Sequence, residues 1–204
     1  MTTQAGAGRS NQKKRTRAAI LAAARDLVES GREVTMPEIA RTALVSEATA
    51  YRYFPDLPSL VGEALSGAWP APADALRPVA GSADPVERVA FACAFLLRGT
   101  LARQGAVRAM MAATITRPET AAARPGVRFG LIEEALAPVR ERFAATAPQR
   151  LAQLERDLAV TVSAEALFCL TDLCGLPPED AITSAVRTAS TLTAAALRDL
   201  PPGP

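Results

Sequence analysis

The chain contains no histidine and only two lysines, Lys13 and Lys14. Histidine is the commonest general base and metal ligand, so its absence removes the usual centre of acid–base catalysis. No P-loop and no G-x-G-x-x-G dinucleotide motif occurs either. Carboxylate-only or serine–lysine chemistry stays open on composition, but both lysines lie close to the N-terminus. We expect a chain that is not an enzyme and that binds no cofactor.

Cysteine and long apolar runs are also scarce. Cys93, Cys169 and Cys174 lack C-x-x-C spacing, and without histidine they do not form a plausible zinc set, so we expect no metal site. Structural thiols in a reducing compartment are the favoured interpretation, with redox sensing left open. No apolar run is long enough to span a bilayer, and residues 1–11 lack a signal-peptide core. The expected location is the cytoplasm, without a membrane partner.

What the chain does contain is a pattern of two short helices with a tight turn at residues 35–54. Thr35 is a suitable N-cap for the first helix, and Pro37 falls in its first turn. Ser46 is the N-cap of the second helix, and Pro55 ends it. In a helix-turn-helix, the N-terminal residues of the second helix meet base edges in the major groove.

The second helix carries side chains that suit DNA. Arg52 can bind guanine, Glu47 can accept from cytosine, and Ala48 or the Thr49 methyl can touch a thymine methyl. Upstream, residues 1–17 contain five Lys or Arg and no acid, a distribution that favours phosphate contacts. The candidate DNA-binding residues are Lys13, Lys14, Arg15, Arg17, Thr35, Ser46, Glu47, Ala48, Thr49, Tyr51, Arg52 and Tyr53.

Residues 12–67 resemble the DNA-binding domain of TetR-family transcriptional regulators. The residues that match the family pattern are Thr35, Ile39, Ala40, Ala43, Val45, Ser46, Thr49, Tyr51, Tyr53 and Phe54. Leu57 departs from it, because the family usually has a phosphate-binding lysine there. The resemblance implies a homodimer on a palindromic double-stranded DNA operator and a C-terminal domain that binds a small effector. Repression is the commoner behaviour in the family.

The remaining sequence is rich in alanine and leucine and predicts an all-α fold. We expect a disordered arm at 1–11, a three-helix DNA-binding domain at 12–67 and a helical regulatory and dimerisation domain at 68–204. A proline-rich stretch near residues 69–85 marks the boundary. Two long amphipathic helices are expected at 149–173 and 179–200.

The two long helices can bury each other within one chain, but the family resemblance also implies a dimer interface. Its candidate residues are Leu158, Val162, Val186, Ala189 and Leu197. A small apolar effector is expected to bind among the aromatic and methionine side chains that lie between the boundary and these helices. The candidate lining is Phe91, Phe95, Met110, Met111, Phe129 and Ile132.

Two other functions stay open. The motif can be a pair of structural helices, which leaves the run from Tyr51 to Tyr53 without a purpose. The chain can also be a helical adaptor or architectural protein whose helix-turn-helix no longer reads DNA. Leu57 favours the adaptor, whereas Arg52 and the basic N-terminal segment favour DNA binding.

Overall fold

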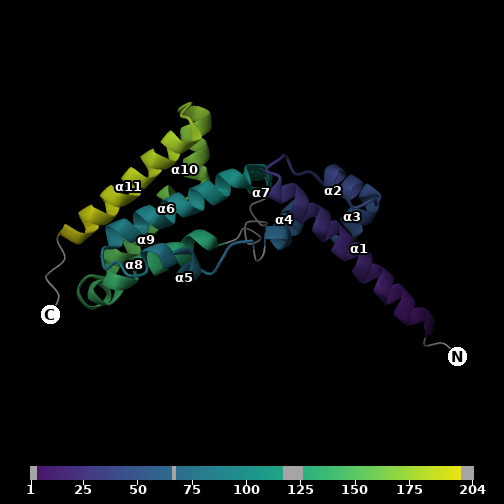
Figure 1. Cartoon of the computed structure of the whole chain (residues 1–204), viewed down its shortest axis with the longest axis horizontal. Helices are drawn as coiled ribbons and strands as arrows, with labels where there is room; N and C mark the ends of the chain where they lie inside the picture. The colour runs from purple at the N-terminus through teal and green to yellow at the C-terminus, as the bar shows by residue number, and fades with distance from the viewer. Residues whose placement is uncertain (1–3, 66–67, 117–125, 199–204) are drawn as a thin grey trace. The chain divides into compact units, whose positions relative to one another are not determined.

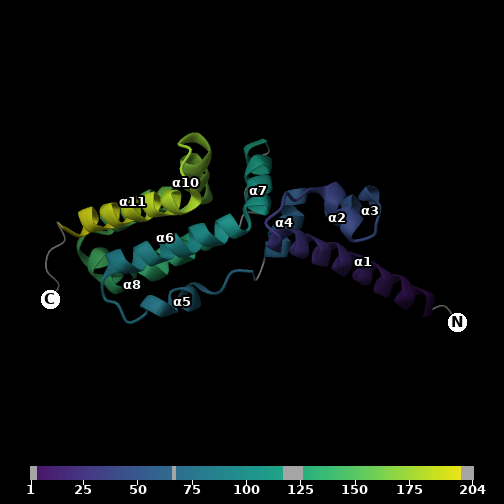
Figure 2. The same ribbon diagram turned by 45° about the horizontal axis from the view of Figure 1, so that its top comes forward.

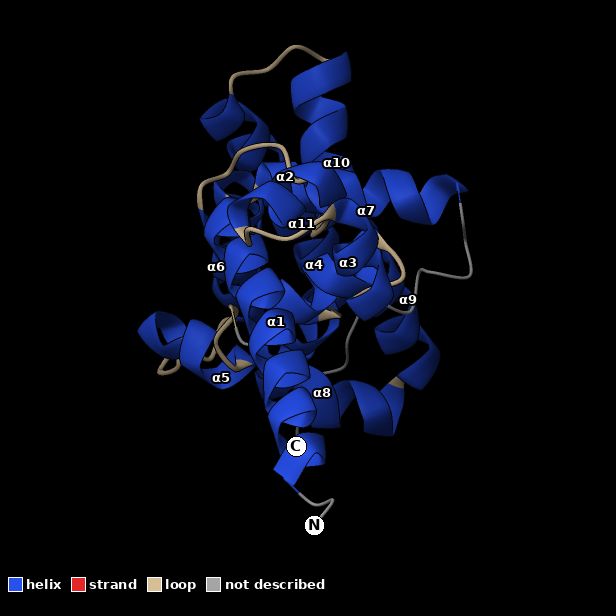
Figure 3. Cartoon of the chain, turned by 90° about the vertical axis from the view of Figure 1, so that its right-hand side faces the viewer, coloured by secondary structure: helices blue, strands red, loops and turns tan. Residues whose placement is uncertain are grey.

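The computed structural model describes residues 4–65, 68–116 and 126–198. Every regular element in these ranges is helical, which confirms the predicted all-α class (Figures 1 and 3). The chain divides into two compact units. Unit 1 comprises residues 1–69 and 102–125, and unit 2 comprises residues 70–101 and 126–204. The expected domains, 12–67 and 68–204, place residues 102–125 in the second domain. By contact the chain returns to unit 1 over this segment.

Unit 1 is built from five helices. They are α1 (Gln4–Glu29), α2 (Met36–Thr42), α3 (Glu47–Tyr53), α4 (Leu57–Leu65) and α7 (Gln104–Thr116). Helix α1 packs against α2 and α4, and α4 packs against α7. Gly31, with φ of 68°, follows the end of α1 in the left-handed conformation that glycine adopts at low cost.

Helix α1 begins earlier than the sequence analysis expected. Residues 4–11 were predicted to belong to a disordered arm, but α1 starts at Gln4 and includes them. Four residues of this stretch, Gln4, Ala5, Ala7 and Arg9, have high helix propensity, and the helix continues through them despite two glycines. Residues 1–3 of the predicted arm lie outside the described residues.

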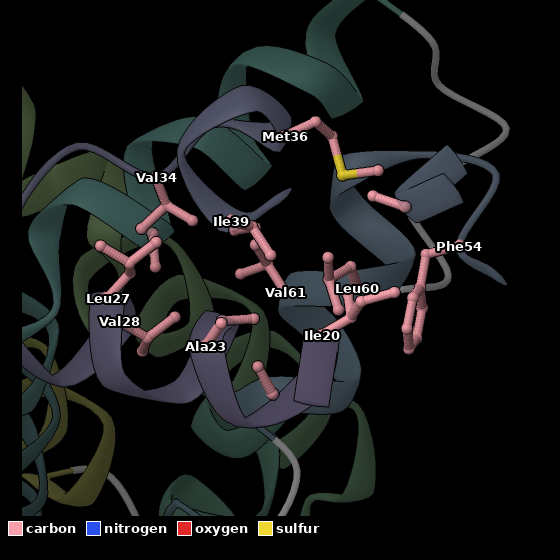
Figure 4. Packing of buried hydrophobic residues seen from close by; sticks show 14 of the residues in the cluster. Ile20, Ala23, Leu27, Val28, Val34, Met36, Ile39, Phe54, Leu60 and Val61 are labelled. Atoms are coloured by element: carbon pink, nitrogen blue, oxygen red, sulfur yellow. The ribbon is translucent and has the colours of Figure 1, made fainter. Parts of the chain in front are cut away.

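The core of unit 1 joins α1, α2, α4 and α7. Figure 4 shows Ile20 and Leu27 from α1 facing Ile39 from α2 and Leu60 from α4. Helix α7 adds Ala106 and Met110, one turn apart on a single face. Met110 is 4% exposed in this core, which corrects its assignment to an effector pocket. Periodicity placed Met110 on a buried face, but it did not identify the partner of that face.

A glycine allows α7 to approach the loop between α1 and α2. A Cβ atom on Gly105 would lie 1.8 Å from the backbone oxygen of Arg32. Backbone atoms cannot withdraw as a flexible side chain can, so any larger residue must displace α7 or the loop.

Unit 2 contains the remaining helices. They are α5 (Pro72–Ala75), the 3₁₀ turn η1 (Arg77–Val79), α6 (Pro85–Ala102), α8 (Val127–Thr146), α9 (Pro148–Thr161), α10 (Ala164–Phe168), the π-helical turn η3 (Cys169–Leu173) and α11 (Pro178–Arg198). Helix α9 packs against α8 and α11, and α10 packs against α11. Helix α11 confirms the helix predicted at 179–200 as far as residue 198.

The helix predicted at 149–173 is wrong as a single element. Helix α9 ends at Thr161, and the chain then turns at Val162, where ψ is 67°. The Ser163 hydroxyl accepts from Ala166 N–H at 3.0 Å and so caps α10. A β-branched pair followed by a strong N-cap residue favours this break, but the continuous apolar periodicity concealed it.

Most of the predicted dimer residues are used within the chain. Leu158, Val162 and Ala189 are each 0% exposed in the core of unit 2. Val186 and Leu197 are half-buried. The apolar stripes of α9 and α11 therefore pack within one subunit. Of the five predicted residues, only Val186 and Leu197 have exposed side-chain surface that a partner could cover.

A buried arginine donates hydrogen bonds to backbone carbonyls of helix α8 near its internal proline. Pro138 lies inside α8 and has no N–H to donate to the carbonyl of Glu134. Arg88, which is 5% exposed on α6, donates from Nη2 to that carbonyl at 2.7 Å and from Nε to the Ala135 carbonyl at 3.3 Å. Its Nη1 donates to Val79 O at 3.1 Å. One guanidinium therefore links α6, α8 and the end of η1.

None of the helices in the described part of the chain combines the length and hydrophobicity needed to cross a bilayer.

Candidate nucleic-acid interface

The geometry of the helix-turn-helix follows from its local sequence. Thr35 Oγ1 accepts from Glu38 N–H at 3.4 Å and begins α2, as predicted. Ser46 Oγ accepts from Thr49 N–H at 3.2 Å and begins α3, also as predicted. Between the helices, Leu44 has φ of 55° and is 92% exposed, while Val45 packs against the core. The turn thus fixes α3 against α2 with a single inward apolar side chain.

Helix α3 presents one face to the protein and the other to solvent. Ala50 and Phe54 are buried. Glu47, Ala48 and Arg52 are exposed, and Tyr51 is 49% exposed. The remaining candidates on α3, Thr49 and Tyr53, are half-buried. The exposed face therefore begins with small and acidic residues and ends with aromatic and cationic ones.

A cationic groove joins α1 to the end of α3. Its volume is about 310 Å³, and it is lined by Gln12, Lys13, Arg52 and Tyr53. The guanidinium of Arg52 lies over the Tyr53 ring, with Cζ 5.6 Å from the ring centroid. Three of these residues were predicted from the sequence. Gln12 was not, because it is uncharged and belongs to no recognisable motif. The groove is wide enough for a phosphate group and has two positive charges on its walls.

Arg17 does not belong to this groove. Its Nη1 donates to Glu63 Oε1 on α4 at 2.7 Å, and its Cζ lies 4.7 Å from the centroid of the Phe54 ring. The hydrogen bond that Arg17 donates to Glu63 raises the pKa of Arg17, and the charge of Glu63 raises it further. Arg17 therefore ties α1 to α4, which differs from the predicted role in phosphate binding.

The other predicted cations of α1 are free to meet an anion. Lys13, Lys14 and Arg15 are exposed, and the first buried side chain after them is Ile20. The N-terminal half of α1 extends past α2 and α3 in two views of unit 1 (Figures 1 and 2). This half of the helix forms a basic extension beside the exposed face of α3.

The start of α4 lacks a cation. Leu57 is half-buried and packs against the core of unit 1. Asp56 Oδ1 accepts from Ser59 N–H at 2.8 Å and caps the helix. The first turn of α4 is therefore capped by a carboxylate and has no side chain that neutralises phosphate.

This arrangement of capped helices coincides with a known family signature. Residues 20–64 match the family model described as "Bacterial regulatory proteins, tetR family". Residues 20–64 therefore form a helix-turn-helix DNA-binding domain of the TetR type. Searches of curated proteins and of solved structures gave no match to the chain.

The predicted effector-pocket residues are divided between the two units. Met110 and Met111 belong to unit 1, and the other four belong to unit 2. In unit 2, Ile132 is buried and Phe129 is 61% exposed, while Phe91 and Phe95 are half-buried one turn apart on α6. Within the ranges that the structure describes, no group of three or more Cys, Asp or Glu side chains is placed to hold a metal ion.

Proposed function

We propose that this regulator is a repressor that binds a palindromic operator as a homodimer and is released by a small apolar effector. It acts by binding and not by catalysis. The observation that carries the proposal is the exposed face of α3 beside the cationic groove of Lys13 and Arg52. A two-fold symmetric pair of such units matches the symmetry of palindromic half-sites.

The geometry favours different tasks for the two ends of α3. Glu47, Ala48 and Thr49 occupy the N-terminal turn, the part of a recognition helix that meets base edges. Arg52 lies in the last turn and shares its groove with Lys13. Two cations around one hollow suit the two non-bridging oxygens of a backbone phosphate. We therefore assign Arg52 to phosphate binding instead of the base contact suggested by its sequence position.

Selection of bound DNA from a random pool provides the operator for a test of these roles. Arg52→Ala is expected to weaken binding to selected and random DNA alike, and to reduce the slope of log K against log[salt] by about one unit. Glu47→Ala is expected to relax preference at one base pair, with a change in discrimination of about 1–3 kcal/mol. Arg25→Ala removes the same charge from an exposed position twelve residues beyond Lys13 on α1 and serves as the control.

Loss of discrimination without a change in salt slope for Arg52→Ala would assign that residue to base readout. If no sequence emerges from the selection and the protein is not retained on DNA at modest salt, the repressor proposal is wrong. The adaptor function, which Leu57 favours, is then the better interpretation.

The effector site is proposed for unit 2, next to α6. Phe91 and Phe95 are half-buried aromatic side chains on one face of α6, and such residues commonly line apolar ligand pockets. Phe91→Trp should shift the concentration of any compound that releases the operator, whereas Phe129→Trp, at an exposed position, should not. Identical release curves for wild type and both variants would exclude this face. If no compound or metabolite extract changes operator affinity, ligand release should be abandoned.

A further inference from the structure

The turn between α10 and α11 brings two cysteines together. Cys169 begins η3 and Cys174 directly follows it, and both are exposed free thiols. The Cys174 N–H donates to the Cys169 carbonyl at 3.1 Å, closing a π-helical turn of five residues. This hydrogen bond places the backbones of the two cysteines side by side, and disulfides join residues whose Cα atoms lie about 4.4–6.8 Å apart.

The turn is also able to adjust. A π-helical turn is a rare and short element that occurs frequently at functional sites. Gly175 follows Cys174 with φ of 68°, and a Cβ atom there would meet nothing within 4 Å. A disulfide needs Cβ atoms about 3.5–4.5 Å apart, so bridging requires the two side chains to turn toward each other, and both are exposed. Helices α10 and α11 flank the turn and need not break.

We propose that Cys169 and Cys174 form a redox modification site, in which a hydroperoxide closes an intrachain disulfide across η3. The thiolate of one cysteine attacks the peroxide O–O bond, giving a sulfenic acid and releasing water or an alcohol. The sulfur of the second thiol then attacks the sulfenic sulfur, forming the S–S bond and releasing water. The two cysteine sulfurs are oxidised by two electrons, and the peroxide is reduced by two.

The third cysteine provides an internal comparison. Cys93 is fully buried on α6, and burial raises its pKa to about 12. Because the thiolate is the reactive form, Cys93 should stay reduced while the exposed pair reacts. Of the three thiols in the chain, one should remain after oxidation. The proposal concerns thiol chemistry alone and does not depend on the proposed function.

Peptide mapping of the full chain tests the bridge. The protein is treated with hydrogen peroxide, its remaining thiols are alkylated under denaturing conditions, and it is cleaved before aspartate. Cleavage before Asp157, Asp172 and Asp180 places Cys169 in peptide 157–171 and Cys174 in peptide 172–179. The expected result is these two peptides joined by a disulfide that reductant releases, in a chain that still migrates at 21.4 kDa without reductant.

Three variants sharpen the result. Cys93→Ser should form the bridge as the wild type does, and Cys169→Ser and Cys174→Ser should each abolish it. Alkylation of all three cysteines after peroxide, conversion of the pair to sulfinic acids, or a linkage found only in a covalent dimer would each overturn the proposal.

Discussion

At the scale of single residues, Cys93 links burial to alkaline stability. Its side chain is 0% exposed, and burial raises its pKa from 9.0 to about 12. Above pH 9 the unfolded state therefore loses the thiol proton while the folded state keeps it, which favours unfolding. Relative to Cys93→Ala, the wild type should lose up to about 1.4 kcal/mol of stability per pH unit above pH 9. Denaturant unfolding from pH 7 to 10.5 measures this difference.

A constant difference between the two proteins across this pH range would show that the thiol ionises equally in both states. The exposed Cys169 and Cys174 are present in both proteins, so their ionisation cancels in the comparison.

Residue roles were predictable from the sequence where the interaction is local. Thr35 and Ser46 cap helices through bonds that reach three residues along the chain, so spacing alone identified them. The pairing of Arg17 with Glu63 spans 46 residues, and no local pattern contains it. The left-handed conformation of Leu44 was also hidden, because the turn geometry imposes it on a residue type that does not favour it.

At the scale of elements, the close approach of α7 depends on Gly105. Gly105→Ala would place a Cβ atom against the Arg32 carbonyl and should destabilise unit 1 by about 1–3 kcal/mol, the usual cost of overpacking. Gly81→Ala provides the matched control, because nothing lies within 4 Å of a Cβ atom there. Equal unfolding midpoints for the two variants would contradict the predicted close contact.

The second prediction for an element concerns Arg88 and Pro138. Arg88→Met should remove the guanidinium donor from the Glu134 carbonyl, which Pro138 cannot replace, and cost about 3 kcal/mol. Pro138→Ala restores an N–H that can donate to Glu134 O. In that background Arg88→Met should cost about 1 kcal/mol less, which a double-mutant cycle by denaturant unfolding can resolve. Additive losses would show that the arginine does not substitute for the missing donor.

Helix type and the capped starts of α2 and α3 were predictable, whereas helix partners were not. The apolar periods of α1 and α11 were clear in the sequence because amphipathic helices repeat every 3.6 residues. The same period ran through Val162 and Ser163, where the chain breaks into α9 and α10. It also gave no sign that α7 packs against α4. Periodicity identifies a buried face but not the surface that covers it.

At the scale of the whole molecule, the homodimer remains a prediction. Fewer of its predicted interface residues are available, because three of the five are buried within the subunit. Sedimentation at micromolar concentration should give about twice the 21.4 kDa chain mass. Val186→Arg introduces a charge at a half-buried position on α11 and should weaken a dimer formed there. Thr183→Arg adds the same charge on the exposed side of that helix and should leave the dimer intact.

A strict monomer for the wild type would exclude the dimer, and dissociation by Thr183→Arg alone would move its interface to the outer side of α11. A dimer interface is hard to predict from the sequence, because apolar residues of the core and of an interface follow the same pattern. Leu158 and Val186 follow the same apolar rule, but only the folded subunit shows which of them is already covered.

The position of Lys13 and Lys14 has a practical consequence. They are the only side-chain amines in the chain, and both are exposed within one turn of the basic extension of α1. A fluorescent amine reagent, applied after the exposed thiols are alkylated and the lower-pKa α-amine is capped near neutral pH, therefore reports on one small region of the surface. DNA seated against α1 should shield these two amines, so the rate of labelling becomes a direct optical measure of occupancy without any engineered tag.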